Sequence, residues 1–123
     1  MKALAIILFS LAAFRLPLSA QVCACTASWY DAPAGPGGTH LTCASWFYPL
    51  GTRLIVHEVH NGLSVVVVVT DRGPAHRLVR AGRRIDLSRP AFAVLDGLEL
   101  GLADVVVEPA IPHSAIPIPH LEK

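Results

Sequence analysis

The chain has little charge and almost no excess of either sign. Charged residues make up 15% of its 123 residues, with 10 Lys and Arg against 9 Asp and Glu. A protein that binds nucleic acid through the phosphates carries a strong basic excess, so we expect no nucleic-acid partner. The basic residues are nevertheless clustered, which indicates either a solvated loop or a patch facing a polyanion. The cluster consists of Arg72, Arg77, Arg80, Arg83, Arg84 and Arg89.

The chain also lacks an apolar run long enough to be read as a membrane span. Its longest candidate, residues 3–13, follows Lys2 and precedes Leu18-Ser19-Ala20, which ends in small residues as a signal-peptide cleavage site does. This pattern predicts a signal peptide over residues 1–20 and an exported protein of the periplasm or cell envelope, either secreted or lipid-anchored. Without residues 1–20 the chain keeps 103 residues, enough for one small domain, and its net charge becomes −1.

Cysteine is scarce as well. Only Cys23, Cys25 and Cys43 are present, and one Cys-x-Cys with one distant cysteine is not a standard zinc ligand set. We therefore expect no metal and no cofactor. Export would allow Cys43 to form a disulfide with Cys25 or with Cys23, and we take Cys25–Cys43 as the candidate. Alternatively, residues 22–25 resemble a lipoprotein box, with Cys25 lipidated as a membrane anchor.

Several short segments have the composition of strands, namely residues 25–30, 53–59, 65–69, 84–87 and 104–108. Asn61-Gly62 predicts a type I′ hairpin turn between two of them, with positive φ at both residues. Residues 65–69 are five consecutive valines, which predicts a strand buried on both faces.

One helix is expected, with Ser88 as its N-cap, Pro90 in its first turn and an end at Gly97. Residues 31–41 should form a loop rich in proline and glycine, and residues 109–123 an irregular, proline-rich tail. The chain shows no repeat and no alternation of strands with helices. The sequence therefore predicts a mainly β protein, a small closed barrel with one short helix.

Two carboxylates stand beside predicted strands. Asp71 follows the valine strand and precedes Arg72-Gly73-Pro74, and Asp86 lies in the short segment 84–87. Enzymes that cleave a glycosidic bond commonly use two carboxyl groups held in fixed positions, as a rigid sheet would hold them. The structural alternatives are an Asx-type turn at Asp71 and an ion pair or helix cap at Asp86.

Aromatic residues flank the first loop. Trp46 and Tyr48 come just before a turn, which predicts exposed platforms for sugar rings, whereas Trp29 should be core. The candidate substrate-binding residues are Trp46, Tyr48, Arg72, Ser45 and Asp31.

Five motifs occur in an order and spacing that resemble the rare lipoprotein A family of bacterial double-psi β-barrel proteins, which includes septal-ring lytic transglycosylases. The resemblance covers residues 26–108, and the barrel is similar to that of expansins and family 45 endoglucanases. The motifs are Ala27-Ser28-Trp29-Tyr30, Pro49-Leu50-Gly51-Thr52-Arg53, Asn61-Gly62-x-Ser64-Val65-Val66-Val67, Asp71-Arg72-Gly73-Pro74 and Ile85-Asp86-Leu87-Ser88.

The resemblance implies a six-stranded double-psi barrel with a groove for peptidoglycan glycan strands. We expect the protein to be a monomer. It implies cleavage of the β-1,4 bond between N-acetylmuramic acid and N-acetylglucosamine, with a 1,6-anhydro product. One carboxyl group can act first as acid and then as base in such a reaction. Asp86 is the candidate for that role, and Asp71 is its positioning or charge-stabilising partner.

The sequence departs from the lytic members at two positions. Ser45 stands where those members have a histidine, and the preceding loop offers only Asp31 and His40 where they have an acidic residue. The endoglucanase relatives suggest Asp31 with Asp86 as a second acid/base pair. The alternative function is a non-catalytic, expansin-like barrel that binds peptidoglycan or another polysaccharide, and a third is an interaction module without affinity for glycans.

Overall fold

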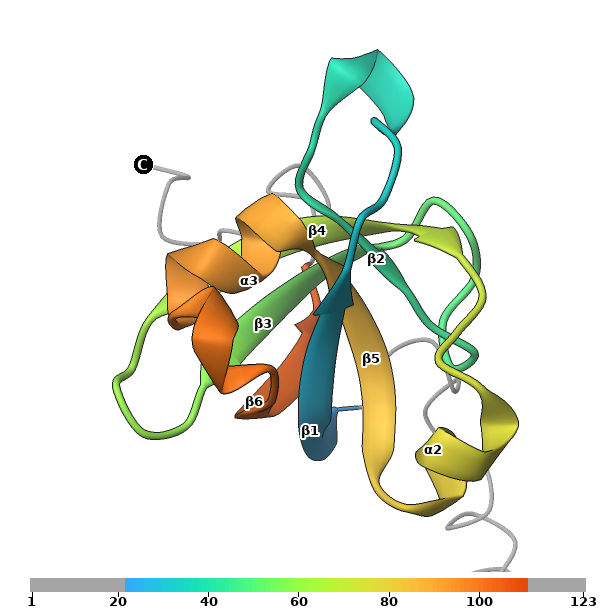
Figure 1. The fold of residues 1–123 in the computed structure, drawn as a ribbon. Helices are drawn as coiled ribbons and strands as arrows, with labels where there is room; N and C mark the ends of the chain where they lie inside the picture. The colour runs from blue at the N-terminus through green and yellow to red at the C-terminus, as the bar shows by residue number, and fades with distance from the viewer. Residues whose placement is uncertain (1–21, 111–123) are drawn as a thin grey trace, which may run out of the picture.

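The computed structural model describes residues 22–110 and forms a closed six-stranded barrel (Figure 1). The strands are β1 (Cys23–Tyr30), β2 (Thr42–Ala44), β3 (Arg53–Glu58), β4 (Ser64–Asp71), β5 (Arg83–Ser88) and β6 (Ala103–Pro109). The helices are α2 (His76–Arg80) and α3 (Arg89–Leu95), with single 3-10 turns η2 (Pro36–Gly38) and η3 (Leu98–Leu100). The mainly β fold class and the six-stranded barrel are therefore confirmed.

Strands that are neighbours in the barrel are mostly distant in the sequence. The order around the barrel is β1-β5-β2-β4-β3-β6, and β6 closes it against β1. Two pairs are parallel, β1 with β5 and β2 with β4, while the other four pairs are antiparallel. Closure gives every strand a paired neighbour on each side, so the barrel has no edge strand.

The barrel interior is filled with aliphatic side chains. Leu54, Val56, Val67 and Leu87 point inward and are fully buried, and Phe92 of α3 joins the same core. α3 lies across one side of the barrel, and residues 31–41 project away from it as a loop (Figure 1). Burying a large apolar side chain stabilises the fold by about 2 kcal/mol, so this core is the main source of stability.

The predicted helix is confirmed, with a different use for its N-cap residue. α3 begins after Ser88, carries Pro90 in its first turn and ends at Leu95, before Asp96 and Gly97. The Ser88 hydroxyl does not cap the helix. It donates to the His40 carbonyl at 2.7 Å and accepts from the Thr42 N–H at 3.2 Å, which ties the 31–41 loop to β5.

Two elements were missed by sequence reasoning. β2 has only three residues, all buried, directly after a loop rich in proline and glycine. Three residues are too few to show the alternation by which a strand is predicted. α2 is a five-residue helix in the arginine-rich stretch and has no buried residue, so it lacks an amphipathic pattern.

The prediction of a valine strand buried on both faces is wrong. Side chains of β4 alternate: Val65, Val67 and Val69 face the core, while Val66 is 43% exposed. The barrel wall is a single sheet, so only one face of each strand meets the interior. Buried and exposed side chains therefore alternate along β4 as in other strands, although five consecutive residues are valine.

The predicted hairpin is present but its turn is not type I′. β3 and β4 are joined by residues 59–63, and Gly62 is the only residue of this turn with positive φ (75°). Asn61 stays at negative φ, and its side chain forms two hydrogen bonds. It donates to the Leu95 carbonyl of α3 and accepts from the Leu63 N–H, both at 2.8 Å.

The predicted Cys25–Cys43 disulfide is wrong, since all three cysteines are free thiols. Cys43 pairs with Leu87 of β5, which pairs with Trp29 of β1, four residues along the strand from Cys25. Four strand residues span about 13 Å, so the two cysteines lie beyond the 7 Å between Cα atoms that a disulfide can bridge. Lipidation of Cys25 stays a prediction; its side chain packs against the barrel core.

The predicted signal peptide, residues 1–20, lies outside the described residues, as does the tail from residue 111 onward. Of the predicted tail, Pro109 instead completes β6, and the Ala110 N–H donates to the Arg53 carbonyl at 2.8 Å. Within residues 22–110, no helix is long and apolar enough to cross a membrane.

Candidate functional site

Asp71 and Asp86 lie on the outer face of the barrel, on either side of one alanine. Ala44 of β2 pairs with Asp86 of β5 on one edge and with Asp71 of β4 on the other. Two strand spacings separate the backbones of the two aspartates by about 10 Å. The barrel therefore brings together the two carboxylates that the sequence predicts, with only a methyl group on the strand between them.

Asp86 is held in one orientation by a neighbour on β1. The Ser28 hydroxyl donates to Asp86 Oδ1 at 2.7 Å, and Ser28 pairs with Asp86 in the parallel β1–β5 register. Ser28 is buried and Asp86 half-buried. With Oδ1 occupied, the other carboxyl oxygen is the one available to exchange a proton with a ligand.

Asp71 ends β4 and is exposed. Its Oδ1 accepts the N–H of Arg72 at 2.8 Å, and its carbonyl accepts the N–H of Ser45 at 3.0 Å. The predicted backbone N–H bond to the carboxylate is thus present. It does not occupy Oδ2, so the turn leaves part of the carboxylate free to face a ligand.

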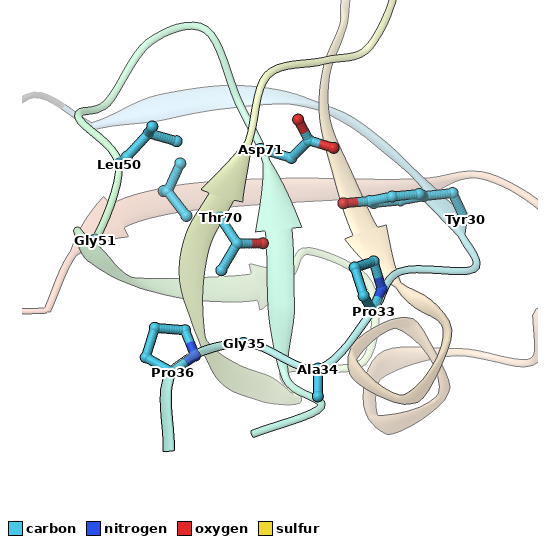
Figure 2. A pocket seen from close by; sticks show the side chains of 10 residues that line it. Tyr30, Pro33, Ala34, Gly35, Pro36, Leu50, Gly51, Thr70 and Asp71 are labelled. Carbon is cyan, nitrogen blue, oxygen red and sulfur yellow. The ribbon is translucent and has the colours of Figure 1, made fainter. Parts of the chain in front are cut away.

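Two neighbouring pockets lie beside these carboxylates, and together they are called the groove here. One, of about 410 Å³, lies between the 31–41 loop and β4 (Figure 2). The other, of about 290 Å³, contains both Asp71 and Asp86. Tyr30 and Asp71 line both pockets, so the two pockets are adjacent. The first pocket is lined by Tyr30, Pro33, Ala34, Gly35, Pro36, Leu50, Gly51, Val69, Thr70 and Asp71.

Tyr30, at the junction of the two pockets, was missed as a site residue. Its hydroxyl points into the pocket toward the side of Thr70 and Asp71 (Figure 2). The hydroxyl oxygen is buried and has no hydrogen-bond partner within residues 22–110. Burial, then the charges of Asp71 and Asp86, raise the pKa of Tyr30 to about 12, and the neighbouring Thr70 side chain opposes part of this rise. The phenol therefore stays protonated near neutral pH. An unpaired polar atom of this kind cannot be recognised in a sequence.

Trp46 is exposed, as the sequence predicts for a sugar-binding platform. It is 43% exposed and lines the pocket that holds both aspartates. Its Nε1 donates to the Pro74 carbonyl at 2.7 Å, and its ring stacks on His76 of α2 with centroids 4.5 Å apart. The indole is therefore fixed in place with one face toward the groove or solvent, as sugar stacking requires.

Tyr48 and Ser45 do not match the predicted exposed, substrate-facing placement. Tyr48 is 5% exposed and belongs to the barrel core, and Ser45 is 1% exposed. The Ser45 hydroxyl accepts the Phe47 N–H at 3.0 Å. The segment 45–48 turns back over the barrel, which buries both residues.

Arg72 holds that turn together. Its guanidinium donates to the carbonyls of Ser45 and Tyr48, at 2.8 and 2.7 Å. It lines the same pocket as the two aspartates, yet its hydrogen bonds go to the backbone. The structure therefore gives it a positioning task beside the groove.

Asp31 is not brought to Asp86. It is exposed and pairs with Arg89, whose Nε lies 3.0 Å from Asp31 Oδ1 and whose guanidinium lies over the Trp29 ring. It lines neither pocket of the groove. The geometry therefore favours Asp71 over Asp31 as the companion of Asp86.

Among residues 22–110, the lining of the groove contains no histidine. His40 is exposed, and its backbone carbonyl is used by Ser88. The described part of the chain also holds no group of three or more His, Cys, Asp or Glu placed to bind a metal ion.

A family model described as "Lytic transglycolase" matches residues 22–107. The chain belongs to this family. The resemblance seen in the five motifs is thereby confirmed, and the groove between β2, β4 and β5 is the candidate active site of a family member.

Two curated relatives carry names that state an activity. A probable endolytic peptidoglycan transglycosylase RlpA of Nostoc sp. is 46% identical over 68 residues, which cover 55% of this chain and 17% of that protein. The endolytic peptidoglycan transglycosylase RlpA of Neisseria meningitidis is 35% identical over 77 residues, covering 63% of this chain and 30% of that protein. The chain thus spans less than a third of the length of these relatives.

Solved structures share the barrel. A mutant expansin of Clavibacter michiganensis in complex with cellohexaose superposes with a TM-score of 0.59 at 18% identity, over 79% of this chain and 54% of that one. The Streptomyces papain inhibitor gives a TM-score of 0.55 at 24% identity, over 79% of this chain and all of that one. At this identity the likeness establishes the double-psi barrel fold alone.

Proposed function

We propose that this protein is an exported lytic transglycosylase that cleaves the β-1,4 bond between N-acetylmuramic acid and N-acetylglucosamine in peptidoglycan. The observation that carries the proposal is the placement of Asp86 and Asp71 on either side of Ala44, in one groove with the exposed Trp46. The family match and the names of the relatives support the substrate class.

In the proposed mechanism Asp86 acts first as acid and then as base. Protonated Asp86 donates to the glycosidic oxygen as the bond to the muramic acid C1 breaks. The resulting carboxylate then accepts the proton of the C6 hydroxyl, whose oxygen attacks C1 and closes the 1,6-anhydro ring. No water enters, and Asp86 ends in the protonated state in which it began.

The neighbouring groups support this sequence of steps. The Asp71 carboxylate stabilises the positive charge that develops at C1 and O5 in the transition state. Ser28 keeps the reactive Asp86 oxygen aimed at the groove, since its bond occupies the other one. Tyr30 donates its unpaired O–H to a substrate oxygen, and Trp46 stacks on a sugar ring.

The alternative is an expansin-like barrel that binds the glycan without cleaving it. The observation that favours it is Ser45, buried where the lytic relatives have a histidine, together with a groove lining that contains no histidine within residues 22–110. In this alternative Trp46 and Tyr30 would retain the glycan while Asp86 would form only its bond to Ser28.

The deciding experiment is digestion of purified, peptide-free glycan strands, with products identified by mass spectrometry. Wild type and Asp31→Asn should release anhydro-muramyl products, because Asp31 lies outside the groove. Asp86→Asn should release none. If wild type releases no product yet sediments with the glycan, the binding alternative holds.

Export is proposed on the pattern of residues 1–20. For Cys25 the packing of its side chain against the core and its pairing with Val105 favour an unlipidated protein. The intact mass of the protein isolated from the cell envelope would test both, since cleavage before Gln21 and a diacylated Cys25 give different masses.

A further inference from the structure

A second chemical feature lies at the start of β1, away from the groove. Cys23 and Cys25 are two residues apart on one strand, so their side chains share a face, and their thiols hydrogen-bond to each other. Both are half-buried against the core, and Arg84 of β5 interacts with both sulfurs. The feature is a pair of thiols in contact beside a positive charge, accessible from solvent.

The two thiols differ in acidity. The hydrogen bond from Cys25, helped by Arg84, lowers the pKa of Cys23 to about 6. The same hydrogen bond, with burial, raises the pKa of Cys25. Cys23 therefore loses its proton more readily than Cys25 does. A low-pKa, accessible cysteine next to a second cysteine is the arrangement found in redox-active thiol pairs.

The backbone at this point is held on one side only. Cys23 to Cys25 pair with β6, whereas pairing with β5 begins at Thr26, where the register shifts. Alternate residues of a strand lie about 6.7 Å apart, at the upper end of the range between Cα atoms in disulfides. A disulfide also needs the two Cβ atoms about 4 Å apart, so this end of β1 must bend out of its extended conformation for the bond to form. Only the pairing with β6 has to yield for that bend, since no β5 residue pairs with Cys23 to Cys25.

We propose that Cys23 and Cys25 form a reversible dithiol–disulfide site that exchanges with external disulfides. The Cys23 thiolate attacks one sulfur of the external disulfide and expels the other as a thiolate. Cys25 loses its proton to solvent and attacks Cys23 Sγ, which closes the Cys23–Cys25 bond and expels the second external thiolate. The protein pair is oxidised by two electrons, and the external disulfide is reduced to two thiols.

Cys43 takes no part in this exchange. It is completely buried, and burial followed by the charge of Asp86 raises its pKa to about 12. β5 lies between β2 and β1, so Cys43 is beyond bonding distance of either partner. Cys43→Ser is therefore a matched control within the same chain.

The test is incubation of the purified, reduced, folded protein with oxidised glutathione, followed by peptide mapping by mass spectrometry. Wild type and Cys43→Ser should form a Cys23–Cys25 link that retains no glutathione and that excess reduced glutathione reverses. Cys25→Ser should instead stop with one glutathione on Cys23. A wild-type protein that retains glutathione on Cys23, links Cys23 or Cys25 to Cys43, or does not react overturns the proposal.

Alkylation of the reduced wild type gives a second measurement that does not depend on the folding of a variant. At pH 7 iodoacetamide should modify Cys23 roughly tenfold faster than Cys25, because the thiolate is the reactive form. Arg84→Gln should narrow this ratio. Equal rates, or faster modification of Cys25, would contradict the assigned roles.

Discussion

At the scale of single residues, two features determine the chemistry of the groove: one hydrogen bond that orients a carboxylate, and one buried hydroxyl without a hydrogen-bond partner within residues 22–110. Asp86 owes its orientation to Ser28, and Tyr30 keeps a buried hydroxyl without a partner. These two features have opposite consequences for stability, which makes them separable by substitution.

Ser28→Ala tests the orientation of Asp86. The substitution removes a 2.7 Å hydrogen bond to a carboxylate and leaves Asp86 in place. We expect the rate of anhydro-product release to fall about tenfold, with a loss of about 1–2 kcal/mol in the free energy of unfolding. An unchanged release rate, measured at saturating glycan, would show that Ser28 has no part in positioning Asp86.

Tyr30→Phe tests the unpaired hydroxyl. Removing a buried polar atom without a partner relieves its desolvation penalty, so the free energy of unfolding should stay the same or rise by about 1 kcal/mol. Glycan binding measured by sedimentation should weaken, because the donor to the substrate is lost. A variant that is less stable but binds normally would mean that the hydroxyl has a structural partner.

At the scale of elements, the turn 45–48 decides which residues reach the groove. It exposes Trp46, buries Tyr48 and is held by the two hydrogen bonds from Arg72. The sequence places both aromatic residues before a turn but does not reveal that the turn folds back over the barrel. The Tyr48 side chain faces the core because of contacts with strands that are distant in the sequence, and no local pattern predicts such contacts.

Arg72→Ala should therefore loosen this turn. Loss of two charge-assisted hydrogen bonds at a partly solvated site should lower the free energy of unfolding by about 2 kcal/mol and weaken glycan binding through Trp46. Urea unfolding measures the first effect. Arg77→Ala, an exposed arginine of α2, is the control and should change stability by less than about 0.5 kcal/mol.

The β3–β4 turn is linked to β6 by a titratable contact. His60 Nε2 lies 3.0 Å from Asp104 Oδ2, and this contact, with the charges of Glu58 and Asp96 nearby, raises the pKa of His60. A raised pKa in the folded state adds stability below the unfolded pKa near 6.5, and this stability is lost as pH rises through the folded value. The stability difference between wild type and His60→Gln should therefore be larger at pH 5.5 than at pH 8. Urea unfolding at both pH values checks it, and a difference that grows with pH would contradict it.

Five strands and α3 follow from alternation, turn residues and the Ser88-x-Pro90 helix start. The carboxylate pair follows from the position of Asp71 and Asp86 beside predicted strands. The sequence does not reveal which strands are neighbours. It could not show that β5 separates Cys25 from Cys43, which excludes their disulfide. Nor could it show that Arg89 lies beside Asp31 and pairs with it outside the groove. β2 was missed because three residues are too few to show a period.

At the scale of the whole molecule, the order β1-β5-β2-β4-β3-β6 places the site. The two aspartates come from β4 and β5, and the donor Tyr30 comes from the end of β1. Only the interleaving of these strands brings the three residues to one groove, so the barrel and the site form together or not at all.

That interleaving also governs when the chain can fold. Both neighbours of β1 and both neighbours of β2 lie later in the sequence than the strand itself. As the chain is synthesised, β3 and β4 can meet first as a hairpin, while β1 waits for residues 83–109. Such long-range pairing is slow, because the loops must close before the contacts form. The first strand made is among the last to be enclosed, so the nascent chain stays open and unfolded until nearly the whole barrel has been translated.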